Sequence, residues 1–390
     1  ARVREVLGCL PEHIRVSCSG NIIKNVKGVI VPNSGGQRGI AIAAILGVVG
    51  GKADGKLQVL QGITDDDRAA AAKLLQENYC DCDLAENVAN LYILIHAEAG
   101  AETAEVEIRD FHTNITRIVK NGKVIFEAGE VKTETDEPDK SLLNLRDILE
   151  FADTVNLDDV RQCLEYQLEC NSAIASEGEK NSWGAGVGRT LLEEYDADDI
   201  RIRATAAAAA GSDARMSGCS LPVVINSGSG NQGITASIPV VEYAKAYGKS
   251  REELLRALCV SNLISLHQKK YIGSLSAYCG AVSAACGSAA GICHMLGGTY
   301  EQVADTITDT IATIGGMVCD GAKPSCAAKI AAALNCALLS MQMAMKKRVF
   351  QPGEGLVKDN VEETIQSVGR MGRDGMRSTD VEILNIMLDK

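Results

Sequence analysis

The stretch SLSAYCGAVSAACGSAAGICHMLGG, residues 274–298, contains no charged side chain. It is long enough to cross a bilayer, but Gly, Ala and Ser gain little free energy on transfer into lipid. We therefore expect a helix buried inside a folded protein. Cys279, Cys286 and Cys293 recur every seven residues, which places them on one side of this helix. Seven residues rise about 10.5 Å along a helix, so we expect at most one of these thiols to serve a given iron–sulfur cluster.

The sequence on either side of this stretch, after about residue 141, is also helical. Three capping-box patterns precede periodic apolar runs there: Ser250 with Glu253, Thr299 with Gln302, and Thr379 with Glu382. We expect residues 141–390 to form a mostly α-helical domain.

The first part of the chain has a mixed pattern. Val106 and Ile108 alternate with glutamates in AEVEIRDF, which indicates a strand, and Asn121-Gly122 separates two β-rich runs, which indicates a hairpin. Residues 65–100 are rich in Ala and Leu and predict a helix. The acidic, proline-containing stretch at 129–140 predicts an exposed connection. We therefore expect an α+β protein with a mixed α/β domain at 1–140 that includes a β-hairpin.

Composition narrows the classes of function. The formal net charge is -12, which disfavours nucleic acid and anionic lipid as partners. The chain shows neither a secretory signal nor a convincing membrane span, so we expect a cytoplasmic protein. Its 14 cysteines are then reduced thiols rather than a disulfide framework. The oligomeric state is left open, with a homo-oligomer among the options.

The segment NSGSGNQG, residues 226–233, contains the G-x-G-x-x-G pattern at Gly228, Gly230 and Gly233. A dinucleotide site needs a second parallel strand after the glycine loop and its helix. The sequence that follows contains Pro239 and helical spacing instead, which argues against a dinucleotide site. Two interpretations remain: a loop whose backbone N–H groups bind an anion, and a tight helix connection whose glycines permit close packing.

A second pair of cysteines lies in GGMVCDGAKPSC, residues 315–326. Gly321 and Pro324 interrupt any helix after Cys319, so Cys319 and Cys326 can approach each other or a shared metal through a turn. No C-x-x-C or histidine pair indicates zinc. Thiolates alone suit iron–sulfur chemistry.

Several long segments, taken in order, resemble the L-cysteine desulfidase family, which is related to the iron–sulfur L-serine dehydratase α chain. They are SGNIIKNVKGVIVPNSGGQRGI, CSLPVVINSGSGNQGITASIPV, LSAYCGAVSAACGSAAG, GGMVCDGAKPSCAAKIA and GMRSTDVEILNIM. The resemblance covers nearly the whole chain. It implies a [4Fe-4S] cluster held by three cysteines, with one iron left open as a Lewis acid. By motif match, Cys279 and Cys319 are two of these ligands.

The third ligand of that family lies in an N-terminal G-C-T-E-P motif, which this sequence does not contain. The chain opens with ARVREVLGCLPE, and Cys9 is too close to the SGNIIKN segment to take the role. We expect either that a preceding segment is missing from the sequence or that Cys326 or another thiol substitutes.

The resemblance implies α,β-elimination from a small amino acid, L-cysteine first and L-serine as the alternative, giving pyruvate and ammonia. The substrate carboxylate would bind the glycine loop, at Asn226, Ser227, Gly228, Ser229, Gly230, Asn231 and Gln232. Lys323, between the two cysteines, is our candidate for the general base, and His112 is a second option that can reach a site between domains. A non-enzymatic iron–sulfur sensor with a closed cluster is the alternative from another class of function.

Overall fold

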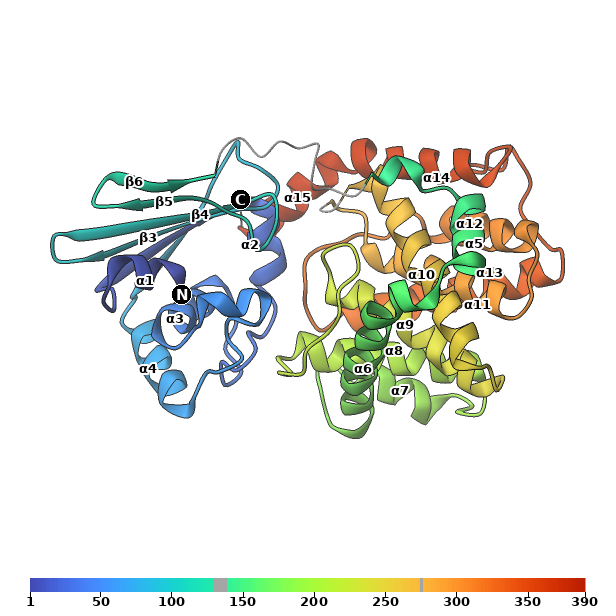
Figure 1. Ribbon diagram of the computed structural model, residues 1–390, viewed down its shortest axis with the longest axis horizontal. Coiled ribbons are helices and arrows are strands. Elements are labelled where there is room, and N and C mark those ends of the chain that lie inside the picture. The colour runs from blue at the N-terminus through green and yellow to red at the C-terminus, as the bar shows by residue number, and fades with distance from the viewer. Residues whose placement is uncertain (129–138, 274–275, 390) are drawn as a thin grey trace.

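The computed structural model describes residues 1–128, 139–273 and 276–389. Figure 1 shows two halves side by side, one built on a β-sheet and the other a bundle of helices. The sheet half contains α1 (Arg2–Leu7), α2 (Gly20–Val26), α3 (Ile40–Val49), η1 (Ala53–Gln58) and α4 (Asp65–Gln76). This arrangement confirms the predicted α+β class.

Six strands form one mixed sheet in the order β2-β1-β3-β4-β5-β6. They are β1 (His13–Cys18), β2 (Cys80–Leu84), β3 (Tyr92–Ala99), β4 (Glu102–Arg109), β5 (Ile115–Lys120) and β6 (Lys123–Glu127). Among the described strands, only β1 and β2 pair in parallel. The predicted hairpin is confirmed between β5 and β6, where Asn121 and Gly122 have φ angles of 50° and 75°. Both values suit the two-residue turn that matches strand twist.

The helix predicted for residues 65–100 was wrong beyond its first third. Helix α4 ends at Gln76, and the chain then forms β2 and β3. Strand β3 hydrogen-bonds to β1 on one side and β4 on the other, and it contributes Ile95 and Ala97 to the core beneath the sheet. Pairing on both edges outweighs the local preference of the sequence for helix.

One face of the sheet is covered by helices. Val3 of α1, Ile42 of α3 and Ala71 of α4 share an apolar core with Ile14 of β1 and Val106 of β4. The opposite face carries charged side chains such as Arg15, which is exposed. This in-and-out alternation is the usual consequence of burying one face of a sheet.

The second half is almost entirely helical. Its elements are η2 (Lys140–Leu142), α5 (Leu145–Thr154), α6 (Leu157–Lys180), α7 (Val187–Glu194), α8 (Ile200–Met216), α9 (Gly230–Ala246), α10 (Arg251–Ile272), α11 (Gly280–Met295), α12 (Tyr300–Ile314), α13 (Cys326–Met345), α14 (Val361–Arg370), η3 (Met371–Gly375) and α15 (Arg377–Met387). Helix α11, from the stretch that we expected to be buried, packs against α9, α10, α12 and α13. Cys286 and Cys293 on this helix are fully buried.

Two of the three predicted capping boxes are confirmed. Ser250 caps α10 with Glu253, and Thr299 caps α12 with Gln302, each with both reciprocal hydrogen bonds. The box predicted at Thr379 was wrong, because α15 already begins at Arg377 and follows the π-helical turn η3 without a break in the chain direction.

The C-terminal helix returns to the sheet half. Asp380 of α15 forms an ion pair with Lys24 of α2, whose side chain is only 2% exposed, and a Cβ atom added at Gly20 would lie 2.3 Å from Leu384. Figure 1 shows α15 lying between the two halves. The predicted connection at 129–140 falls mostly on residues 129–138, which lie outside the described residues, and the division at residue 140 stays a prediction.

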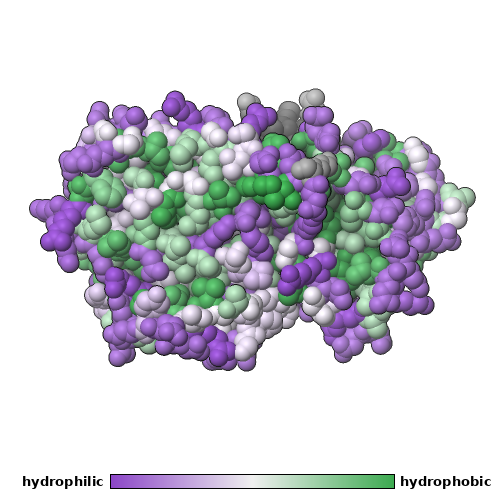
Figure 2. Space-filling view, turned by 180° about the vertical axis from the view of Figure 1, so that it is seen from behind, coloured by the Kyte–Doolittle hydropathy of each residue, from purple (hydrophilic) through white to green (hydrophobic). Residues whose placement is uncertain are grey.

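The hydropathy of the surface and the length of the apolar helices are the two features that relate to a membrane span. Figure 2 shows hydrophilic residues over much of the rear face, with apolar patches between them. By length and composition, α13 is the one described helix that passes the test for crossing a bilayer, and half of that window is buried in the protein. A core helix passes the same test, so this is weak evidence for a span.

We expect the buried Lys24–Asp380 pair to stabilise the junction between α2 and α15. A double-mutant cycle with Lys24→Met and Asp380→Asn, followed by chemical unfolding, should give a coupling free energy of about 1–3 kcal/mol. The same cycle at the exposed Arg2–Asp54 pair, whose side chains are 38% and 95% exposed, should give less than about 1 kcal/mol. Equal coupling at the two pairs would contradict this expectation.

Candidate functional site

The backbone brings Cys279 and Cys319 together. Tyr278 and Val318 form an isolated antiparallel bridge. The Cys279 N–H donates to Met317 O at 2.9 Å, and the Cys319 N–H donates to Ala277 O at 2.6 Å. Cys279 is the N-cap residue of α11. Two segments that are distant in the sequence are thus held in register, with a cysteine on each.

The two thiols interact directly. A hydrogen bond from the Cys279 thiol holds the pKa of Cys319 well below its usual range, and the same bond raises the pKa of Cys279. Nearby Lys24 and Lys329 also favour the Cys319 thiolate. Metal ligation requires the thiolate form of cysteine, and these surroundings favour that form at Cys319.

Cys326 lies beside this pair, at the first position of α13. Its thiol donates to Gly321 O at 3.5 Å, and it is close enough to both other thiols to affect their charge. Among the described residues, no three His, Cys, Asp or Glu side chains are placed to hold one metal ion. An iron–sulfur cube takes each thiolate on a different iron, so its ligands need not converge on one point. The all-sulfur donor set fits such a cluster.

Cations gather around the cysteines although the chain as a whole is acidic. Lys24 and Lys329 act on Cys319, Arg215 acts on Cys326, and Lys269 acts on Cys319 and Cys279. Burial lowers the pKa of Lys269 to about 8. The sequence analysis missed these basic residues, because the polar stretch SLHQKKYI, residues 265–272, does not distinguish the buried Lys269 from the neighbouring Lys270.

The predicted base Lys323 is half-buried in the loop between Cys319 and Cys326. Its ammonium forms an ion pair with Asp320 and donates to the carbonyls of Asp320 and Gly321 at 3.3 and 3.4 Å. The same Asp320 also pairs with Lys329. Lys323 therefore helps to shape the loop that presents the two thiols.

The glycine loop forms a tight turn that leads into α9. Asn226 and Ser229 exchange two backbone hydrogen bonds, and Ser227 and Gly228 between them have φ angles of 48° and 80°. The Asn226 amide donates to Asn262 Oδ1 at 2.9 Å, so this side chain anchors the loop. No second parallel strand follows α9 in the described sheet, in agreement with the rejection of a dinucleotide site.

The loop and the cysteines belong to one site. A Cβ atom added at Gly280, next to Cys279, would lie 2.3 Å from Gln232 Cδ, and the buried Gln232 Oε1 has no hydrogen-bond partner among the described residues. Arg215 donates to Asn231 Oδ1 at 3.3 Å and acts electrostatically on Cys326. The N-termini of α9, α11 and α13, which carry the positive ends of the helix dipoles, therefore meet in one region.

The sheet half supplies the other wall. A Cβ atom added at Gly321 would lie 2.0 Å from Lys24 O, and one added at Gly28 would lie 3.4 Å from Ala322 O. His112, from the turn between β4 and β5, lies 3.9 Å from a Cβ atom built on Gly228. Burial lowers the pKa of His112. The candidate site thus lies at the junction of the two halves, and His112 borders it.

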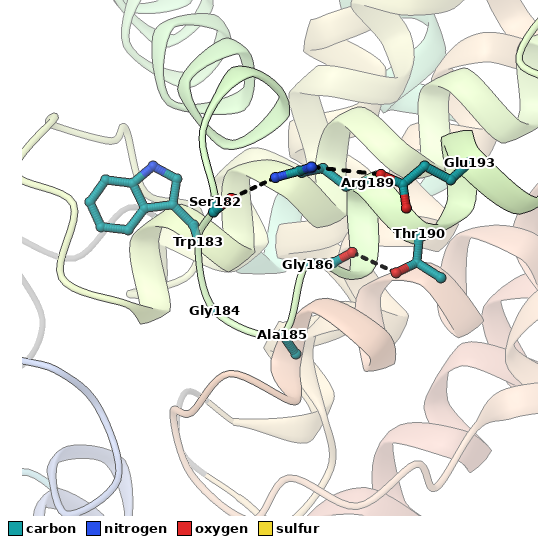
Figure 3. A pocket seen from close by; sticks show the side chains of 8 residues that line it. All are labelled: Ser182, Trp183, Gly184, Ala185, Gly186, Arg189, Thr190 and Glu193. Carbon is teal, nitrogen blue, oxygen red and sulfur yellow. Dashed lines mark hydrogen bonds and ion pairs between the residues drawn. The ribbon is translucent and has the colours of Figure 1, made fainter.

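A separate open pocket of roughly 260 Å³ lies on the helical half (Figure 3), lined by Ser182, Trp183, Gly184, Ala185, Gly186, Arg189, Thr190 and Glu193. Arg189 is held there by Ser182 Oγ at 2.6 Å and by Glu193 at 3.7 Å. None of the predicted site residues lines this pocket. The polar side chains of this pocket are already bonded to neighbouring residues, so we assign no reaction to it.

Comparisons with known proteins identify the family of the chain. A family model described as the serine dehydratase alpha chain matches residues 54–385. A UPF0597 protein of Lachnoclostridium phytofermentans is 47% identical, over 100% of this chain and 93% of its own length. Similar UPF0597 proteins of Finegoldia magna (48%) and Treponema denticola (44%) align with 100% of this chain and with 93% and 91% of their own lengths. The names of these UPF0597 proteins state no activity or cofactor.

The contact between Gly321 and the backbone of Lys24 should be sensitive to a single methyl group. We expect Gly321→Ala to lower the free energy of unfolding by about 1–3 kcal/mol more than Gly353→Ala. Gly353 is a matched control, because its φ of 91° is close to the 93° of Gly321 but no atom lies within 4 Å of its added Cβ. Equal losses in thermal unfolding would show that the close contact between the halves does not form.

Proposed function

The chain belongs to the serine dehydratase alpha chain family, and from this premise we propose that it is a lyase that catalyses α,β-elimination from L-cysteine, giving pyruvate, ammonia and sulfide. The observation that carries the proposal is the pairing of Cys279 with Cys319, at the start of α11 and among buried cations. L-serine is the alternative substrate, and the family description favours it. The free cysteines suit the reducing cytoplasm, which we propose as its location.

Cys279, Cys319 and Cys326 would hold the [4Fe-4S] cluster that the family implies. With only three protein thiolates, the cluster leaves one iron open, which supplies a Lewis acid at the substrate. The neighbouring cations Lys24, Lys269 and Lys329 compensate the negative charge of the thiolates. The loop from Asp320 to Ser325 keeps Cys319 and Cys326 on one side of the site.

The loop from Asn226 to Gln232 would bind the substrate carboxylate. The first backbone N–H groups of α9 have no partner within the helix and carry its positive dipole end. Arg215 donates to the side-chain oxygen of Asn231, so the amide N–H groups of Asn231 take no part in this bond. The buried, unpaired oxygen of Gln232 would accept from the substrate ammonium.

A base must remove the α proton of the substrate. Lys323 stays our sequence-based candidate, and the structure adds Lys269, which is 8% exposed and makes no ion pair with any described carboxylate. A buried lysine whose pKa lies near 8 has a neutral fraction that can accept a proton at neutral pH. Comparing Lys269→Met with Lys323→Met identifies the base. The variant that lacks the base should still bind the substrate but should no longer turn it over.

We expect the cysteine ligands to differ sharply from the packing cysteines of α11. After anaerobic reconstitution, Cys279→Ser and Cys319→Ser should lose the cluster and all pyruvate release, since both thiolates would be ligands. Cys286→Ser, a change at a fully buried thiol on the same helix, is the control and should keep its iron. Iron and sulfide analysis with a pyruvate assay on cysteine and serine provides the measurement.

The outcomes of this series are distinct. Cys326→Ser that loads normally would show that the third ligand is another thiol. Full loading without pyruvate from either amino acid would contradict the enzyme proposal and favour an iron–sulfur sensor.

The substrate loop gives an independent expectation. Asn231→Ala should weaken binding of the amino acid by about 1.5–3 kcal/mol, which is roughly ten- to hundredfold in affinity. Iron content should not change, because Asn231 is not a ligand. Ser182→Ala, in the separate pocket, is the control and should leave affinity unchanged. Unaltered affinity in Asn231→Ala would place the carboxylate elsewhere.

A further inference from the structure

Two cysteines on the edge strand β2, Cys80 and Cys82, lie outside the site described above. In the register of the parallel pair, Ile14 is opposite Cys80 and Val16 is opposite Cys82. Ile14 and Val16 are buried, so both thiols lie on the helix-covered side of the sheet. Asp81, between them, points to the other side, where it pairs with His13.

The two sulfur atoms are already neighbours. Cys80 Sγ and Cys82 Sγ are 3.9 Å apart. Cys82 is exposed and Cys80 is half-buried, so a solute can reach the pair from the open edge of the sheet. Among the described strands, β2 pairs only with β1, which leaves its outer edge free of a partner. Cys18, the nearest third thiol, is buried.

The charge distribution assigns different roles to the two thiols. The hydrogen bond from Cys80 lowers the pKa of Cys82, and the same bond raises the pKa of Cys80. Cys82 is thus both the more exposed sulfur and the one favoured as a thiolate. The thiolate is the attacking form in disulfide exchange.

A bond between them requires a local change in the backbone of β2. Residues two apart in an extended strand have Cα atoms about 6.4–6.8 Å apart, at the upper limit of the Cα distances of about 4.4–6.8 Å that disulfides span. Their Cβ atoms, which a disulfide brings to about 3.5–4.5 Å, lie almost as far apart as the Cα atoms. As a short edge strand bonded on one side, β2 can bend out of its extended conformation to bring the two Cβ atoms together. A disulfide at this limit is easily reduced, which suits reversible exchange rather than a structural role.

We propose that Cys80 and Cys82 form a thiol–disulfide exchange site for low-molecular-weight disulfides of the glutathione type. The Cys82 thiolate attacks one sulfur of the disulfide, forms a mixed disulfide, and expels the first small thiolate. The Cys80 thiol then loses its proton and attacks Cys82 Sγ, which forms the Cys80–Cys82 bond and expels the second small thiolate. The protein loses two protons and two electrons, which the small disulfide takes up to become two thiols. This proposal does not depend on the elimination chemistry.

Digestion with trypsin isolates this pair. Residues 74–109 contain no Lys or Arg before Arg109, and their only cysteines are Cys80 and Cys82. The full chain would be reduced, treated with glutathione disulfide, and capped with N-ethylmaleimide before mass spectrometry. We expect the wild-type peptide to lose two hydrogens and to carry neither glutathione nor maleimide.

Single variants separate the two steps. Cys80→Ser should trap glutathione on Cys82, because the second thiol is missing. Cys82→Ser should react at least about tenfold more slowly at Cys80, the less exposed and less acidic thiol. Cys163, an exposed cysteine on α6, is an internal control that should take glutathione as a mixed disulfide only. Circular dichroism spectra of the two variants that match the wild-type spectrum would show that neither substitution disturbs the fold.

Three outcomes would overturn the proposal. The first is a wild-type peptide carrying two maleimides at a glutathione disulfide concentration that modifies Cys163. The second is a wild-type peptide that accumulates a mixed disulfide without closing the bond. The third is a Cys82→Ser variant that reacts as fast as Cys80→Ser, which would contradict the assignment of Cys82 as the attacking thiol.

Discussion

Direct contact between helix backbones, made possible by glycine, is the constraint on which the helical half depends. A Cβ atom added at Gly287 of α11 would lie 2.4 Å from the backbone Ser261 O of α10, and one added at Gly291 of α11 would lie 2.5 Å from Ala257 O of α10. Even one methyl group at such a position would force the helices apart. Since α11 is held closely by its neighbours, its first turn, which carries Cys279, has a fixed position relative to α9 and α13.

The second organising feature is charge. The chain carries a formal charge of -12, yet Lys24, Lys269 and Lys329 lie around Cys279 and Cys319 at the junction of the two halves. Lys24 and Lys329 pair with Asp380 and Asp320. Lys269 is buried without an ion pair to any described carboxylate, which costs stability. Such a cost is expected where a site must bind anions, and here the thiolates and an anionic substrate group would supply the negative charge.

The junction explains why the chain has two halves with different architectures. The helical bundle supplies the thiols and the glycine loop, while the sheet half supplies Lys24 and His112 from short segments at its edge. Helix α15 ties the bundle back to α2 through Asp380. Packing within the bundle fixes the positions of the cysteines, and the sheet half lies against them from the other side. The dithiol on β2 belongs to the sheet half and lies outside this junction.

The sequence by itself determined the α+β class, the Asn121-Gly122 hairpin and the buried small-residue helix, because each follows from local turn chemistry, periodicity or composition. It also singled out Cys279, Cys319 and the glycine loop through motifs of the family. Only the tertiary structure decided that residues 80–99 form strands, since their pairing partners are distant in the chain. It also decided that Lys24, Arg215 and Lys269 surround the cysteines. Charges that are scattered through the sequence acquire a common role only when packing brings them to one place.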